Sequence, residues 1–415
     1  MDPTYRSTIE IEAASVSSDE SNIPVALVLD DGRFATVANG GKVENTDLSG
    51  GASGSVEVPA DYVASPNEDG SAPYDFEFVD YDPATGHIEH WIKITAASSS
   101  INTPVHLCYG DDTVITSQEN VAGTWGNGYE GVWHLGEGGG TAYDSTSNGN
   151  DASDHASATG TTGQIGDGQE FDGSNDYYNA GSDSSLDDIF DGGGTVSVWI
   201  HPTSGGENNS GKIFNKKPSG GVATQVWLGN LSGSDMSFLV SQDFSGQYGV
   251  WKSANREVTF NVYQHIAVTY NNNSDSNDPT LYYNGSSVSI NEDTAPSGSR
   301  VSDASVDLYI GNRADQERTF DGYIDELMFS SVARDADWVS TTFENQDDPE
   351  PDGNFWAALG AEEEVESDQP YFTYFSQARP VVEADPYFWQ TSQTLPVVES
   401  DVYFWRMAQT MPVVE

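Results

Sequence analysis

Basic residues and cysteine are scarce in this chain, and each shortage excludes a class of protein. Only 15 Lys and Arg stand against 66 Asp and Glu in 415 residues, which gives a formal charge of −51. Charge of that sign repels nucleic acid and anionic lipid, so we expect neither as a partner. Cys108 is the single cysteine, so no disulfide can form within the chain. The fold must therefore be stabilised by packing.

Long apolar runs are missing as well. No stretch approaches the ~20 apolar residues that span a bilayer, so we expect no membrane insertion. Met1 is followed directly by Asp2, Pro3 and a strand-like segment, so we also expect no secretory leader in this sequence.

The excess of carboxylates points to the solvent in which the protein works. In dilute buffer, so much charge of one sign destabilises a compact fold by self-repulsion. Molar salt screens that repulsion, because the Debye length falls to about 3 Å at 1 M. We therefore expect a halophilic source, with an ordinary acidic extracellular protein as the alternative.

What the chain does contain is strand-forming sequence. In Tyr74–Phe78 aromatic residues alternate with carboxylates, which is typical of a half-buried antiparallel strand. The turn residues Asp82–Gly86 join this segment to another alternating one, His87–Thr95. Short strands separated by such turns predict a β-sandwich over residues 1–123.

Residues 347–415 contain a repeat. Pro-Val-Val-Glu begins at Pro380, Pro396 and Pro412, a period of 16 residues, and Phe355-Trp356 is a candidate degenerate copy. Units this short cannot bury their own apolar faces, so we expect them to stack on one another or on other chains. We predict a β-rich docking or homo-oligomerising element. The alternative is an unstructured acidic tail, which the high aromatic content disfavours.

Two family resemblances organise the rest. Residues 124–346 carry, in order, VWHLGE, AYDSTSNGND, GQEFDGSNDYYNAG, TVSVWIHP, YQHIAVTY and FDGYIDELMFSSVARDADW. They resemble a laminin-G-like, concanavalin A-like jelly roll, which implies glycan or protein binding through loops, commonly with one structural calcium. Residues 1–123 carry YRSTIEIEAASV, IPVALVLDDGRF, YDFEFVDYDPATGHIEHWIKI and VHLCYGDD. They resemble an uncharacterised β-sandwich family that accompanies such domains in archaeal and bacterial surface proteins. The predicted fold is therefore all-β, with two antiparallel sandwiches and the repeats.

One loop has the spacing of a calcium ligand set. Asp144, Thr146 and Asn148 place oxygen atoms at positions 1, 3 and 5, and Gly149 follows at position 6 for a sharp turn. Taken alone, the loop is equally an ordinary Asx-rich turn. The laminin-G-like resemblance implies that Asp144 and the Asp of the late Ile-Asp-Glu strand lie near the metal. The candidate ligands of one structural calcium are Asp144, Asn148, Asn150, Asp172 and Asp325.

Glycan contact requires exposed aromatic faces beside hydrogen-bonding side chains. Trp251 lies in the polar stretch GQYGVWKSANRE, and Tyr178 lies among Asn and Asp residues. We name both as candidate glycan-binding residues. The alternative for each is a place in the core, because most aromatics here sit in alternating strands.

Catalytic signatures are missing. The sequence has no H-E-x-x-H motif and no G-x-S-x-G motif. Gly206–Lys212 has the spacing of a phosphate-binding loop, but Ile213 stands where Ser or Thr is required, and no helix-forming segment follows. We expect a non-enzymatic protein.

These features favour a virion surface protein, of the capsid or tail, from a halophilic virus. We expect it to bind a host-surface glycan or glycoprotein, and to contact other virion proteins or its own copies through the repeats. A cell-surface or secreted glycan-binding adhesin of a halophile is the alternative. A decoration protein without a ligand is the second alternative.

Overall fold

The computed structural model describes residues 2–365 apart from 156–158, 218–221 and 233–234. This part is mostly antiparallel β-sheet, as the sequence predicts, with helices α1 (Val121–Thr124) and α2 (Ala336–Asp347). In this part of the chain no helix has the length and hydrophobicity needed to cross a bilayer. The predicted repeats from Pro380 onward lie outside the described residues.

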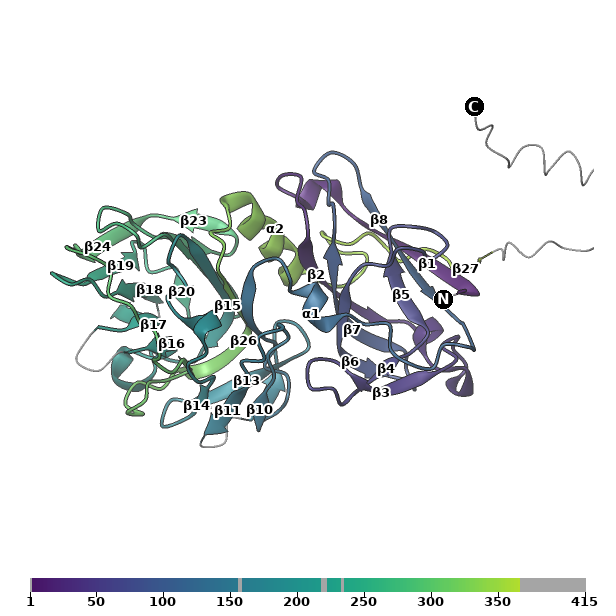
Figure 1. The fold of residues 1–415 in the computed structure, drawn as a ribbon, viewed down its shortest axis with the longest axis horizontal. Coiled ribbons are helices and arrows are strands. Elements are labelled where there is room, and N and C mark those ends of the chain that lie inside the picture. Colours follow the sequence, from purple (N-terminus) through teal and green to yellow (C-terminus); the bar gives the residue numbers. More distant parts are fainter. Residues whose placement is uncertain (1, 156–158, 218–221, 233–234, 366–415) are drawn as a thin grey trace, which may run out of the picture. The chain divides into compact units, whose positions relative to one another are not determined.

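The first sandwich is built from two facing sheets and a hairpin (Figure 1). One sheet has the order β27-β1-β8-β5, the other β2-β7-β6, and β3 pairs with β4. Their apolar faces share one core, which holds Ile9 of β1, Leu27 of β2 and Leu107 of β8. The strands are β1 (Tyr5–Ile11), β2 (Ile23–Asp30), β3 (Thr46–Gly50), β4 (Val56–Pro59), β5 (Tyr62–Ser65), β6 (Phe76–Asp82), β7 (His87–Ile94), β8 (Thr103–Tyr109) and β27 (Glu363–Glu364).

In the second sandwich, a ten-stranded sheet faces an eight-stranded sheet. The ten-stranded sheet contains β10 (Thr141–Ala142), β11 (Ala152–His155), β14 (Tyr177–Asn179), β16 (Lys212–Lys216), β17 (Thr224–Ser232), β18 (Asp235–Gln242), β19 (Gly249–Ser253), β20 (Val258–Thr259), β24 (Ile290–Thr294) and β25 (Tyr309–Ile310). The eight-stranded sheet contains β9 (Tyr129–Trp133), β12 (Gly160–Thr162), β13 (Asp167–Asp172), β15 (Gly194–Pro202), β21 (Gln264–Tyr270), β22 (Thr280–Tyr283), β23 (Ser286–Val288) and β26 (Asp321–Ser330). The core between them is continuous, with Val198 and Ile324 from one sheet against Val226 and Phe238 from the other.

The outer face of the eight-stranded sheet packs against the first sandwich. Ala26 and Trp91 of the first sandwich join Val132, Ile165 and Met328 of the second in one buried cluster. The two sandwiches form a single compact unit as a result. The outer face of the ten-stranded sheet lies on the opposite side, where none of the described elements packs over it (Figure 1).

Helix α2 adds to the contact between the two sandwiches. The carboxylate of Asp335 caps its N-terminus. Asn345 accepts a hydrogen bond from the Ala26 N–H at 2.7 Å and donates one to the Ala26 carbonyl at 2.9 Å. Phe343 stacks on Trp199 of β15 with ring centroids 5.8 Å apart. The helix therefore binds both sandwiches.

After α2 the chain returns to the first sandwich. Phe355 and Trp356 are fully buried in its core, and Trp356 Nε1 donates to the Ala26 carbonyl at 2.8 Å. Strand β27 then pairs with β1, with Tyr5 opposite Glu364. The described start of the predicted third region thus completes the N-terminal sandwich. Phe355 and Trp356 act there as core residues.

Candidate functional site

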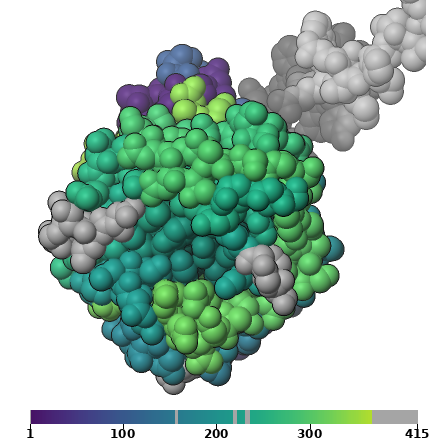
Figure 2. All heavy atoms as spheres, turned by 90° about the vertical axis from the view of Figure 1, so that its left-hand side faces the viewer, coloured from purple at the N-terminus to yellow at the C-terminus, as the bar shows by residue number. Residues whose placement is uncertain are grey.

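A hollow on the outer face of the ten-stranded sheet is the candidate binding site. In β17, Val226 and Leu228 belong to the buried core, so strand alternation turns Gln225 and Trp227 outward. These two side chains, with others from β16, β18 and β19, line a hollow of about 350 Å³. Figure 2 faces this side of the domain and shows a central recess of teal residues between green ones.

Aromatic rings and amides lie next to one another in the hollow. Tyr248 is 37% exposed, and Trp227 is half-buried. Asn215 Nδ2 donates to Gln225 Oε1 at 2.7 Å, and Gln225 Nε2 donates to Ser241 Oγ at 3.1 Å. This hydrogen-bonded row fixes polar groups across three strands, beside the exposed ring faces.

Positive charge gathers at the same place. Lys212 Nζ lies 4.4 Å from the centroid of the Trp227 ring, which is a cation–π geometry. Lys217 and Arg313 also line the hollow, and its described lining includes no Asp or Glu. Burial, followed by repulsion from Arg313 and Arg318, lowers the pKa of Lys212 to about 7.

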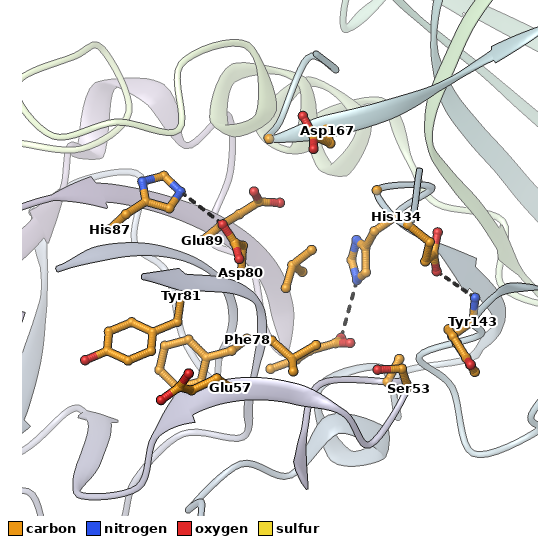
Figure 3. Close-up of a pocket in the computed structure, with 17 residues that line it drawn as sticks. Ser53, Glu57, Phe78, Asp80, Tyr81, His87, Glu89, His134, Tyr143 and Asp167 are labelled. Atoms are coloured by element: carbon orange, nitrogen blue, oxygen red, sulfur yellow. Dashed lines mark hydrogen bonds and ion pairs between the residues drawn. The ribbon is translucent and has the colours of Figure 1, made fainter. Parts of the chain in front are cut away.

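A larger cavity, of about 630 Å³, lies between the two sandwiches (Figure 3). His134 in its wall has Nδ1 2.9 Å from Glu326 Oε1 and Nε2 3.4 Å from Glu77 Oε2. Burial lowers the pKa of His134, but the two carboxylates outweigh burial and hold this pKa well above its usual value. The charged imidazole therefore joins the first sandwich to the second.

Several further acidic residues line this cavity, together with His87 and uncharged side chains. Glu89 is 4% exposed, and burial, followed by repulsion from Glu326, raises its pKa to about 8. The described lining contains no Lys or Arg. In the described part of the chain, no three His, Cys, Asp or Glu side chains are grouped so as to hold a metal ion. We interpret the residues around the cavity as part of the structural contact between the two sandwiches, and not as a binding site. The other acidic residues around the cavity are Glu57, Asp80, Glu137 and Asp167.

The calcium candidates in the first loop are occupied by protein hydrogen bonds. Asp144 is 5% exposed, and its oxygens accept from backbone N–H groups, including that of Asn150, and from the Thr146 hydroxyl. Asn148 and Asn150 donate their side-chain amides to the Glu130 carbonyl at 3.0 and 2.8 Å. These bonds, together with that from Trp133 Nε1 to the Asn150 carbonyl at 3.0 Å, join the loop to β9.

The other two calcium candidates lie elsewhere. Asp172 accepts from the Ser174 N–H at 2.8 Å within its own turn. Asp325 is fully buried and accepts from the N–H groups of Gln164 and Ile165 at 2.7 and 3.0 Å. Asp144, Asn148 and Asn150 thus share one hydrogen-bonded loop, whereas Asp172 and Asp325 each have partners of their own. In the described part of the chain, the five candidates are not grouped into one coordination shell. Calcium binding stays a prediction.

Both predicted glycan-binding aromatics are core residues. Trp251 and Tyr178 are 0% exposed. Trp251 Nε1 donates to Asp278 at 2.7 Å, and the Tyr178 hydroxyl donates to Gln169 at 2.6 Å. Neither offers the exposed ring face that the sequence interpretation required. The aromatic residues that do line a hollow, Trp227 and Tyr248, were not singled out from the sequence.

Comparison with known proteins supports the fold of the second sandwich. Residues 172–340 match the family model of the concanavalin A-like lectin/glucanases superfamily. No curated protein sequence matches the chain. Three similar solved structures can be named. The binding domain of Paraclostridial Mosquitocidal Protein 1 has a TM-score of 0.40 and 15% identity over 52% of each chain.

Domain 4 of AbnA, a GH43 extracellular arabinanase from Geobacillus stearothermophilus in complex with arabinotriose, has a TM-score of 0.35 and 16% identity, over 52% of this chain and 98% of that one. The Botulinum Neurotoxin serotype G binding domain has a TM-score of 0.38 and 14% identity, over 52% of this chain and 50% of that one. The chain thus covers about half the length of the mosquitocidal binding domain, 52%. The family match identifies a concanavalin A-like lectin/laminin G domain at residues 172–340, and the N-terminal sandwich stays unassigned.

Proposed function

We propose that this protein binds carbohydrate, without catalysis, in the hollow on the outer face of the ten-stranded sheet. The observation that carries this proposal is the presence of Trp227 and Tyr248 beside the amides of Asn215 and Gln225. The apolar face of a sugar ring packs on an aromatic ring, while its hydroxyls pair with amides held at fixed positions. A volume of about 350 Å³ suits a short saccharide.

The composition of the hollow argues against glycoside hydrolysis there. That reaction requires two carboxyl groups on either side of the scissile bond. The described residues that line the hollow include neither Asp nor Glu, and no His. Lys212 has a pKa of about 7 but no acidic partner in the lining with which to form an acid–base pair.

The proposal is tested by removing the aromatic ring. We expect Trp227→Ala to weaken binding on a glycan array at least about tenfold, equivalent to ~1.4 kcal/mol. Tyr177→Ala is the matched control, because Tyr177 is in the same sheet but stacks on His155 and does not line the hollow. Equal loss in both variants, or full binding by Trp227→Ala, would contradict the proposed site.

We further propose that the protein acts on the surface of a virus of a halophile, or as an adhesin of the halophile itself. The support is the charge of −51 and the 16-residue repeat, whose short units require neighbours. A glycan is the expected ligand in both settings, and it is a host glycan in the viral one. Immunogold labelling of particles and of cells distinguishes the two.

A further inference from the structure

We infer that the hollow selects acidic saccharides, those that carry a carboxylate or sulfate group. The inference rests on the proposed function and adds the chemical class of the ligand. A distinct set of observations carries it, namely the placement and pairing of the basic residues.

Basic residues are concentrated at the hollow, although the chain as a whole is strongly acidic. The chain has 15 Lys and Arg, and Lys212, Lys217 and Arg313 all line this one site. A fourth, Arg318, is adjacent, because its carbonyl accepts from the Lys212 N–H at 3.0 Å. With 66 carboxylates in the sequence, a lining without Asp or Glu is a departure from the rest of the surface. A local positive potential of this kind attracts an anionic group.

Among these residues, Lys212 gives the strongest evidence for an anionic ligand. It is 5% exposed, yet it makes no ion pair with any described residue, and its ammonium group has one long hydrogen bond, 3.4 Å to Ser210 Oγ. Lys216, four residues on in the same strand, shows the usual arrangement. It is 1% exposed, and its Nζ lies 3.1 Å from Asp187 and 3.2 Å from Asp303.

A buried ammonium group without a counter-ion destabilises a fold. In a chain so rich in carboxylates, a partner for Lys212 would be easy to provide, as it is for Lys216. The acid group of a bound sugar fits the place of the missing partner. Arg313 contributes less, because Asp315 at 2.7 Å and Glu317 at 3.5 Å already neutralise it.

The other walls of the hollow explain why the ligand is a saccharide. Trp227 and Tyr248 offer ring faces, and Gln225 offers an amide that the buried Asn215 holds in place, so a ring with hydroxyl groups can lie beside them. A long polyanion such as nucleic acid would extend beyond the hollow onto a surface of net charge −51, which repels it. A compact acidic sugar meets the cations without that repulsion.

The test uses pairs of ligands in which one member carries acidic groups and the other member carries none. Calorimetry in 1 M KCl compares trigalacturonate with its methyl ester, and 3′-sialyllactose with lactose, on the full chain. We expect the acidic member of at least one pair to bind at least about tenfold more tightly. Lys212→Met should remove this preference, so that the acidic member binds no more tightly than the neutral one.

Lys252→Met is the charge-matched control. Lys252 lies on the same outer face in β19, pairs with Asp293 at 2.6 Å and does not line the hollow. We expect it to keep the preference. Lys212→Met should fold, because it removes an unpaired buried charge, and its melting temperature should not fall below that of the wild type.

Each remaining outcome is decisive. Equal affinity for both members of each pair overturns the acidic selectivity and leaves the proposed function standing. If neither pair binds, the acidic class is wrong, and the proposed function fails as well when the neutral glycan array is also negative. If inorganic sulfate competes as strongly as the acidic sugar itself, the hollow is a general anion site and the saccharide class is overturned.

Discussion

Glu89 is a buried acid whose carboxyl group has no hydrogen-bond partner among the described residues, although it faces the cavity between the sandwiches (Figure 3). Burial raises its pKa to about 8, and Glu326 repels its charged form further. The folded state therefore binds a proton that the unfolded state releases between about pH 4.5 and pH 8. Ionisation of Glu89 opposes the attachment of the two sandwiches, whereas His134 favours it.

The first prediction concerns this residue. Because the pKa of Glu89 is raised in the folded state, its destabilising effect is absent below about pH 4.5, grows between about pH 4.5 and pH 8, and is complete above about pH 8. Glu89→Gln should therefore raise the free energy of unfolding at pH 8 by a few kcal/mol at most, on the order of ~1–3. At pH 5 the difference should be small. Urea unfolding at both pH values measures it, with the exposed Glu350→Gln as control. A gain that does not depend on pH would refute the assigned ionisation.

At the level of elements, strand alternation predicts much of the fold. The segment His87–Thr95 was expected as a strand, and β7 runs from His87 to Ile94. What alternation does not reveal is which face of a strand turns inward when both faces carry mixed residues. Trp251 has polar neighbours and was expected outside, but its register in β19 points it into the core. Trp227 lies between Val226 and Leu228, so its outward direction could have been read from the sequence.

The site itself could not be predicted from local sequence, because its parts come together through strand pairing. Lys212 and Trp227 are fifteen residues apart in the sequence and lie opposite each other in the β16–β17 pair. Arg313, which also lines the hollow, comes from much later in the sequence. Similarly, nothing in the local pattern of Phe355-Trp356 separates a repeat from a core segment of the N-terminal sandwich. That distinction needs the long-range pairing of β27 with β1.

This return segment carries the second structural prediction. A chain that ends after Asp347 loses Phe355, Trp356 and β27, and loss of a buried Trp alone costs about 3–5 kcal/mol. We expect a large fall in melting temperature for the first sandwich. A chain that ends at Ser367 retains all of these contacts and should melt like the full protein. Differential scanning calorimetry of the two truncated chains compares them directly. Similar melting of both would show that the return segment is dispensable.

At the scale of the whole molecule, negative charge is the dominant property. The 66 acidic residues exceed the basic ones by 51, so most carboxylates have no cation to pair with. The ion pairs that do form are placed at the core edges and between segments, such as Arg6 with Glu68 and Lys216 with Asp303. The remaining surface therefore repels itself at a range set by the ionic strength.

The salt dependence of stability tests this property. Raising KCl from 0.1 M to 2 M shortens the Debye length from about 10 Å to below about 3 Å, so repulsion between exposed carboxylates disappears. We expect the melting temperature at pH 7 to rise with salt by on the order of ten degrees or more. Screening should stabilise the fold by a few kcal/mol, and each kcal/mol raises the melting temperature by several degrees. Near pH 4.5, where the carboxylates begin to take up protons, the same salt step should have a smaller effect. An osmolyte such as sucrose is the control, because it stabilises folded proteins without screening charge. The melting temperature at pH 7 could instead be independent of KCl, or the response at pH 4.5 could be equally large. Either result would mean that repulsion between carboxylates does not limit the stability of the fold. The inference of a halophilic setting would then lose its physical basis.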